Sequence, residues 1–160
     1  MYMKKTIPIV TVFFLLLISG CAKNLPEVGG TAAQTVANEW WVTFALNGED
    51  QIGSPVKIAT YNTSDNKDSI WVDDLEHTWQ FKCKVKADYQ ALTFQTDGSQ
   101  NEYYDIQVKI TNGKILHKAG ISRTGNITDS IYLEATFTDD PDNKYTLSGT
   151  ARTMYAEDDY

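Results

Sequence analysis

Hydrophobic and polar residues alternate with a period of two along most of the chain after residue 38. Between residues 77 and 85, for example, Trp79, Phe81 and Cys83 share one face while polar side chains occupy the other. This alternation predicts half-buried β-strands. The strands expected from it cover residues 40–46, 55–63, 69–73, 77–85, 92–96, 102–111, 114–118, 127–138 and 144–154.

Short polar turns separate these strands. Asp97-Gly98 and Asn112-Gly113 are dipeptides typical of tight hairpins, so we expect a turn at each. Residues 31–37 are expected to form one helical turn, with Thr31 as its cap. Strands that follow one another through tight turns favour an all-β fold, an up-and-down antiparallel barrel of about eight or nine strands. A sandwich is the alternative, but the chain lacks the Cys…Trp…Cys spacing of the immunoglobulin fold.

The N-terminus has the pattern of an export signal. Lys4 and Lys5 precede an apolar run over residues 7–18, which is too short to cross a bilayer, where about 20 residues are needed. The run ends in Ile18-Ser19-Gly20-Cys21, which resembles the lipobox of bacterial lipoproteins. The expected organisation is a signal peptide over residues 1–20, lipid attachment at Cys21, a membrane tether over residues 21–35 and one barrel domain over residues 36–160.

The residue after the cysteine bears on localisation. Ala22 follows Cys21, and by resemblance to lipoprotein sorting in Gram-negative bacteria the absence of aspartate there favours transfer to the outer membrane. Residues 22–27 contain one acidic residue, whereas surface-displayed lipoproteins often carry an acidic cluster after the cysteine. We therefore expect a protein of the cell envelope, held at the outer membrane by acyl chains and facing the periplasm.

The net charge limits the classes of binding partner, and the number of cysteines limits disulfide formation. The chain has 14 Lys and Arg residues against 21 Asp and Glu, and removing Lys4 and Lys5 with the signal leaves 12 against 21, a net charge of −9. This charge argues against nucleic acid and against electrostatic binding to anionic lipid. If Cys21 is acylated, Cys83 is the only remaining thiol, so no internal disulfide can form. Its position on an apolar strand face predicts a buried, inert side chain.

The sequence carries no recognisable catalytic or metal-binding motif. It has no Gly-x-Ser-x-Gly nucleophile elbow, and His77 and His117 stand apart at strand ends, so we assign no catalytic residue. Acidic residues at 73–74 and 139–142 are interpreted as turn-forming, because no calcium-loop spacing surrounds them. We expect no metal and no cofactor, and we interpret residues 156–160 as a solvated tail.

One modification is suggested by a repeated triplet. Asp-Ser-Ile occurs at residues 68–70 and again at 129–131, each time near the start of an expected strand. The triplet resembles an O-glycan acceptor site of exported proteins in some Gram-negative bacteria, which makes Ser69 and Ser130 candidates for O-glycosylation.

Several short motifs resemble a known family of bacterial lipoproteins. They are Glu39-Trp40-Trp41-Val42, Ala59-Thr60-Tyr61-Asn62-Thr63, Ser69-Ile70-Trp71-Val72-Asp73, Tyr104-Asp105-Ile106, Asn112-Gly113-Lys114, Asp129-Ser130-Ile131-Tyr132, and Tyr145-Thr146-Leu147-Ser148-Gly149 followed by Arg152. Together they cover nearly all of residues 36–157 and are similar to the lipid-binding putative hydrolase family. The resemblance implies a calycin-like, lipocalin-related barrel and transfers no catalytic residue.

The lipocalin comparison also implies one contact. In lipocalins a basic residue from the last strand covers an early tryptophan at the closed end of the barrel, and Trp40 and Arg152 are the candidates for this pair here. Strict alternation places Arg152 on the outer face, so the contact requires a bulge at Gly149.

The leading functional hypothesis is an outer-membrane-anchored protein that binds a lipid or another small apolar ligand inside its barrel. Eight-stranded barrels are just wide enough to be filled by side chains or to hold one small ligand. The alternatives are an esterase-like hydrolase, as the family name suggests, and a non-catalytic accessory subunit of an envelope complex. Expected partners are thus the ligand, the membrane and envelope proteins, but not nucleic acid. The residues expected to line the ligand site are Trp40, Phe44, Trp79, Phe81, Phe94, Tyr104 and Ile106.

Overall fold

A computed structural model describes residues 29–65 and 67–160 of the chain. The predicted signal peptide, Cys21 and most of the predicted tether lie outside these residues. In the part of the chain that the structure describes, no helix is long and apolar enough to cross a membrane.

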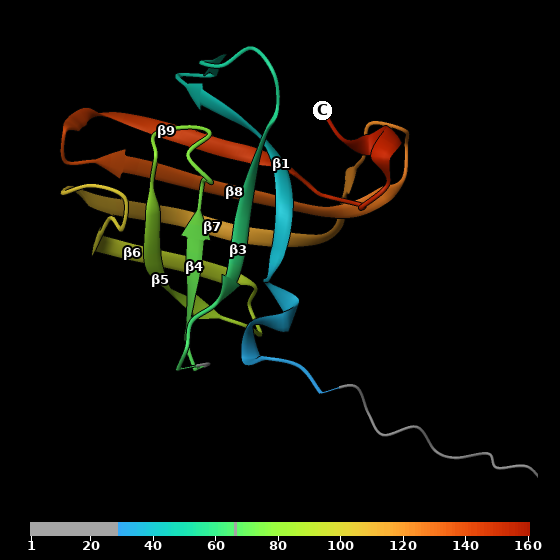
Figure 1. Cartoon of the computed structure of the whole chain (residues 1–160), viewed down its shortest axis with the longest axis horizontal. Coiled ribbons are helices and arrows are strands. Elements are labelled where there is room, and N and C mark those ends of the chain that lie inside the picture. Colours follow the sequence, from blue (N-terminus) through green and yellow to red (C-terminus); the bar gives the residue numbers. More distant parts are fainter. Residues whose placement is uncertain (1–28, 66) are drawn as a thin grey trace, which may run out of the picture.

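The described chain folds into an up-and-down antiparallel barrel, as predicted (Figure 1). Consecutive strands pair side by side, and β1 closes the barrel by pairing with β9 from Trp40↔Ala151 to Leu46↔Tyr145. The very short β2 adds to the edge of β1 and is not one of the eight barrel strands. The elements are η1 (Ala32–Thr35), β1 (Asn38–Leu46), β2 (Glu49–Asp50), β3 (Val56–Asn62), β4 (Ser69–Asp73), β5 (Lys82–Asp88), β6 (Thr93–Gln100), β7 (Gln107–Ile121), β8 (Ile127–Phe137), β9 (Asp140–Ala151) and η2 (Ala156–Asp158).

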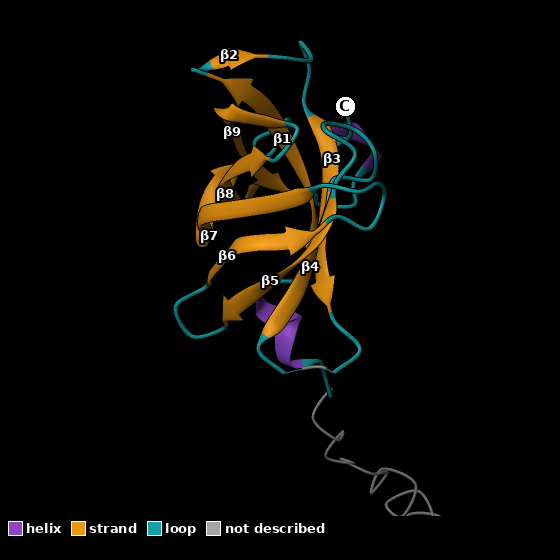
Figure 2. Cartoon of the chain, turned by 90° about the vertical axis from the view of Figure 1, so that its left-hand side faces the viewer, coloured by secondary structure: helices purple, strands orange, loops and turns teal. Residues whose placement is uncertain are grey.

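The two ends of the barrel are built from different loops. At the end that we call the η1 end, η1 lies near the β3–β4 and β5–β6 connections. β7 and β8 also meet on this side of the sheet, but their longer hairpin carries the β7–β8 connection away from η1 to η2. At the opposite end, the β2 end, the β2 hairpin lies with the β4–β5, β6–β7 and β8–β9 connections. Figure 2 shows η1 and β2 at opposite ends of the molecule.

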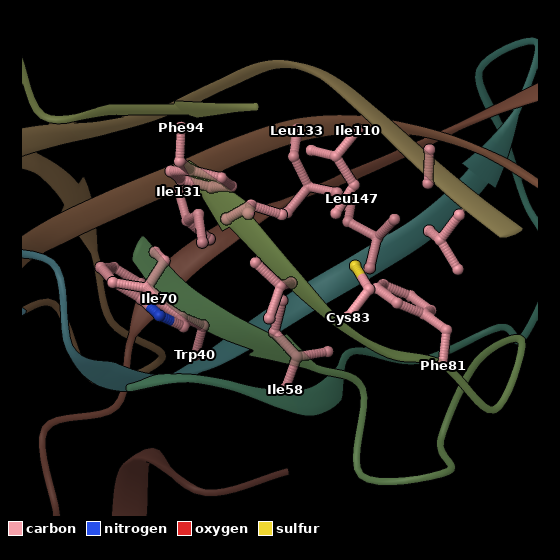
Figure 3. Close-up of a cluster of buried hydrophobic side chains, with 14 of the residues drawn as sticks. Trp40, Ile58, Ile70, Phe81, Cys83, Phe94, Ile110, Ile131, Leu133 and Leu147 are labelled. Carbon is pink, nitrogen blue, oxygen red and sulfur yellow. The ribbon is translucent and has the colours of Figure 1, made fainter. Parts of the chain in front are cut away.

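Apolar side chains fill the interior, as the alternating pattern predicts. The inward residues of β1, Trp40, Val42 and Phe44, are all at most 4% exposed. The indole of Trp40 donates a hydrogen bond of 2.9 Å to the Thr60 hydroxyl, which in turn donates to the Val36 carbonyl and so fixes η1 to β3. Figure 3 shows how side chains from opposite walls meet across the barrel. The largest fully buried side chains are Trp40, Phe81, Phe137, Ile58, Ile70, Ile110, Leu133 and Leu147.

Asn112-Gly113, predicted to be a hairpin turn, lies inside one long strand. β7 continues through it for 15 residues, and Asn112 has a left-handed φ of 54°. The register against β8 shifts between Thr111 and Lys114, so the dipeptide forms a bulge. A tight hairpin and the bulge formed here both use a left-handed residue, and the long continuous partner strand β8 selects the bulge.

Two other strand boundaries were also predicted wrongly. Asp97-Gly98 lies within β6 at a second irregularity, between Thr96 and Ser99, and the chain turns only after Gln100. The expected strand over residues 77–85 begins only at Lys82, because Gln80 has a φ of 58° and the residues before it form a loop. The predicted helical turn is present as η1, but the Thr31 side chain makes no capping hydrogen bond.

The C-terminal residues are packed against the barrel rather than solvated. The Asp158 carboxylate, 2% exposed, accepts hydrogen bonds from the Thr124 hydroxyl and amide and from the Thr153 hydroxyl. Asp159 binds the guanidinium of Arg152. These contacts join the end of the chain to the β7–β8 turn.

The predicted covering of Trp40 by Arg152 does not form. The β1–β9 register runs through Gly149 without a bulge, so Arg152 stays on the outer face. There its guanidinium binds the carboxylates of Glu39 at 2.7 Å and Asp159 at 2.5 Å. The Arg152 amide also donates to the Glu39 carbonyl, so both the side chain and the backbone of Arg152 contact Glu39 of β1.

Candidate functional site

The β4–β5 loop at the β2 end is organised around one buried carboxylate. Asp74 is fully buried and accepts hydrogen bonds from the amides of Glu76 and Phe81, both 2.9 Å, and from the Thr78 hydroxyl at 2.7 Å. The Asp74 amide donates to the Phe81 carbonyl, which closes the base of the loop. Left-handed φ angles at Leu75 and Glu76 make the tight turn. The loop therefore has a defined shape, and Trp79 lies close to its end.

Trp79 packs across the end of the barrel against aromatic side chains from β8 and β9. Its ring stacks on Phe137 with centroids 5.0 Å apart and an interplanar angle of 9°, and lies 5.0 Å from the ring of Tyr145. Phe44 stacks on the other side of this group, 4.8 Å from Tyr145, and Phe81 lies 5.5 Å from Phe137. We call these five residues the aromatic cap. Stacked aromatic pairs contribute about 0.5–1.5 kcal/mol each beyond area burial.

Two acidic residues of the β8–β9 turn hold the rim of this cap. Asp139 accepts hydrogen bonds from the Trp79 indole at 3.2 Å and from the Tyr104 hydroxyl at 3.0 Å. Asp140 accepts one from the Tyr145 hydroxyl at 2.7 Å. Burial, and then the bond to its carboxylate, raises the pKa of each tyrosine to about 12, so both phenols stay neutral donors near neutral pH.

The seven residues predicted to line a ligand site separate into two groups. Phe44, Trp79 and Phe81 belong to the aromatic cap, and Tyr104 and Ile106 lie in the adjoining β6–β7 loop. Trp40 and Phe94 lie toward the η1 end instead, as Figure 3 shows for Trp40 and Phe94 relative to Phe81. Sequence alternation missed Phe137 and Tyr145 as members, although both stand at inward positions beside the Asp139 turn.

Comparison with known families finds a match that covers the barrel. The sequence model of the lipid-binding putative hydrolase family matches residues 25–156, which is most of the chain and the whole barrel. The chain belongs to this family. A search of curated proteins finds no match.

The hydrolase part of the family name directs attention to nucleophiles and bases. Cys83 is fully buried, and burial, followed by the nearby Asp74 and Asp73 carboxylates, raises the pKa of its thiol, so it is the inert core residue that the sequence predicts. The ring nitrogen Nδ1 of His77 bonds to the Lys57 carbonyl at 2.7 Å, and that of His117 lies 2.9 Å from the Asp129 carboxylate.

The acidic pairs considered as calcium sites have partners within the protein. Asp73 accepts hydrogen bonds of 2.6 Å from the hydroxyls of Tyr61 and Tyr103, while Asp74 organises the loop described above. Over residues 29–65 and 67–160, no group of three or more His, Cys, Asp or Glu side chains is arranged to hold a metal ion.

The described surface carries two further hollows. The larger, about 720 Å³, is lined by residues of β5 to β8, which include the outward-facing Lys114 and Tyr132 and the buried Phe94. The smaller, about 250 Å³, lies at the η1 end beside Trp40 and His117. The candidate glycan acceptors lie on the outside of the barrel: Ser69 begins β4 and Ser130 is half-buried in β8, and their modification stays a prediction.

Proposed function

We propose that this protein is an envelope lipoprotein that captures a lipid or another small apolar ligand at the β2 end of its barrel. The observation that supports this most directly is the position of Trp79, which closes the barrel from a loop and is only partly buried. Membership of a lipid-binding family supports a lipid as the ligand. In this proposal the ligand displaces the indole and takes its place against Phe137 and Tyr145.

The geometry of the β4–β5 loop allows the Trp79 indole to be displaced by a ligand. The base of the loop is fixed by the mutual hydrogen bonds of Asp74 and Phe81, whereas the Trp79 indole is tied to the rim through a single hydrogen bond of 3.2 Å to Asp139. The indole can therefore leave without breaking the base of the loop. Backbone held in left-handed conformations, as at Leu75 and Glu76, concentrates at ligand clamps and switch segments.

The free energy lost when the Trp79 indole is displaced and the free energy gained when an acyl chain is buried are of similar size. When the indole moves away from Phe137 and Tyr145, two aromatic contacts are lost, and each costs about 0.5–1.5 kcal/mol. Each methylene group that enters the barrel contributes about 0.8 kcal/mol in return. An acyl chain that buries about four carbons would thus offset the displacement, which favours a chain-like ligand over a small polar one.

The anchor and the location are part of the proposal. The lipobox that ends at Cys21 supports acylation there, and several acyl chains at one point bind a membrane stably while one chain binds it marginally. Ala22 supports the outer membrane as the destination, with the domain facing the periplasm.

Replacing Trp79 tests the proposal. A fluorescent fatty acid titrated into the domain from Glu27 onward should bind saturably. Trp79→Ala should bind it about tenfold more tightly, which corresponds to 1.4 kcal/mol, because no ring has to be displaced. Trp71→Ala is the matched control, since Trp71 lies on the outer face beneath Lys82 and Lys84 and should leave affinity unchanged.

Two results would contradict the proposal. One is an affinity that depends on Trp71 and not on Trp79. The other is the absence of saturable binding in the wild type and in Trp79→Ala alike, which would show that the barrel end takes no acyl chain.

A further inference from the structure

A second bulge in β7 places an imidazole and a carboxylate together at the η1 end. Leu116 pairs with Ser130 and Gly120 with Thr128, so residues 117–119 of β7 face Asp129 alone. Lys118 adopts a left-handed φ of 53° in this bulge. Bulges turn side chains in new directions and are common next to active sites.

Asp129 contacts His117 and Lys118 of the bulge through one carboxylate oxygen. Its Oδ1 lies 2.9 Å from Nδ1 of His117 and accepts a hydrogen bond of 2.7 Å from the Lys118 amide. A carboxylate only accepts, so the Nδ1 of His117 carries a proton, and in the neutral ring the lone pair is then on Nε2. This is the tautomer that a general base needs, oriented by a carboxylate as in catalytic dyads and triads.

The imidazole borders a hollow of suitable size and chemistry. The hollow of about 250 Å³ is lined by His117 and Asp129 together with Trp40, Leu92 and residues of η1 that include Thr35. The Trp40 indole N–H is already bonded to Thr60, so the ring contributes an apolar surface. Among the lining residues, His117 and Asp129 are the titratable ones.

We propose that His117 and Asp129 form the base dyad of an esterase site in this hollow, acting on a short acyl ester. His117 Nε2 takes a proton from a water molecule, and the hydroxide oxygen bonds to the ester carbonyl carbon. The bond between that carbon and the alkoxy oxygen then breaks, and the imidazolium returns its proton to the leaving alkoxide. The products are a carboxylic acid and an alcohol, with water as the only co-reactant.

This inference goes beyond the proposed ligand capture and does not depend on it. The dyad lies at the η1 end and the aromatic cap at the β2 end, so failure of fatty-acid binding at Trp79 leaves the dyad untouched. The structure also supplies a matched control. His77 lies at the β2 end, and its Nδ1 contacts the Lys57 carbonyl rather than a carboxylate.

The test is hydrolysis of p-nitrophenyl butyrate by the full chain purified in detergent. The wild type should show saturable turnover. His117→Gln should lower kcat/KM by about 100-fold, within the range that general-base catalysis contributes. His77→Gln should leave kcat/KM unchanged, and thermal melts should show that each variant remains folded.

Asp129→Asn separates catalysis from a purely structural role in the bulge. The amide oxygen of asparagine still accepts the Lys118 N–H, so the bulge is kept, but the negative charge beside the imidazole is lost. The value of kcat should therefore fall about tenfold or more while KM stays unchanged, because the substrate still binds but the base is less well oriented. An unchanged kcat in Asp129→Asn, equal losses in the two histidine variants, or no turnover above the buffer rate would each overturn the inference.

Discussion

Hydroxyl groups donate hydrogen bonds to several carboxylates at the barrel ends and on its outer wall. Tyr61 and Tyr103 donate to Asp73, and Thr124 and Thr153 donate to Asp158. Such charge-assisted bonds are stronger than neutral ones. Tyrosine and threonine hydroxyls thus hold the loops of this acidic protein at these carboxylates.

Glu134 on the outer face of β8 shows how this affects stability with pH. The hydrogen bond from Lys144 lowers its pKa most, and bonds from neighbours that include Tyr132 and Thr111 bring the pKa to about 2, against 4.5 for an ordinary glutamate. Because the folded-state pKa is depressed, its contribution to stability is present above about pH 4.5 and is lost as the pH falls toward 2.

We therefore expect Glu134→Gln to lower the free energy of unfolding at pH 7 and to have progressively less effect as the pH falls below 4.5. Urea unfolding at pH 7, 4 and 2.5 measures this. Glu49→Gln, at an exposed position of β2, is the control and should have no effect at any of these values. A cost of Glu134→Gln that stays constant from pH 7 to 2.5 would refute the assignment.

The two bulges of β7 determine the local shape of the sheet. The first depends on Gly113, where a Cβ would meet the Phe94 carbonyl oxygen and would lie 2.5 Å from the Phe94 ring. The second lies at residues 117–119, opposite Asp129. One long strand is thus redirected twice, once around a core phenylalanine and once at the hollow beside His117.

Gly113→Ala should destabilise the barrel by about 2 kcal/mol or more, since neither the backbone nor the buried ring of Phe94 can move away freely. For a domain of this size that corresponds to a fall in Tm of at least about 5 °C in a thermal melt. Gly98→Ala is the control on the neighbouring strand, because the nearest atom to its Cβ is 3.6 Å away. Similar melting temperatures for the two variants would contradict this account of the bulge.

Sequence patterns predicted the type of these elements better than their ends. The alternation identified β1, β3, β4 and β8 because each has one buried and one outer face. It could not distinguish a bulge from a turn at Asn112-Gly113, because both use a left-handed residue and the choice depends on the partner strand. Trp79 continues the alternating pattern of the next strand although it belongs to a loop, because its ring packs against the same core.

At the scale of the whole molecule, the closed barrel could be predicted and the arrangement at its ends could not. Closure follows from successive antiparallel strands that would otherwise leave open edges. The aromatic cap joins Phe44, Trp79 and Tyr145, which are far apart in sequence, so only the closed topology brings them together. The same holds for the C-terminal residues, whose contacts with Thr124 and Arg152 come from two other parts of the chain.

The two ends of the barrel therefore have separate roles in our account. The β2 end carries an aromatic cap with a loop-borne indole, and the η1 end carries an oriented histidine beside a hollow. The central claim is that a lipid binds at the aromatic cap by displacing the Trp79 indole.

Native mass spectrometry of the domain from Glu27 onward, produced in a bacterial periplasm and purified without added lipid, tests this claim most directly. We predict a non-covalent adduct of lipid mass that is lost on denaturation and is enriched in Trp79→Ala relative to Trp71→Ala. An unliganded mass in all three proteins, unchanged after incubation with fatty acids and phospholipids, would contradict it and would show that the aromatic cap takes up no lipid.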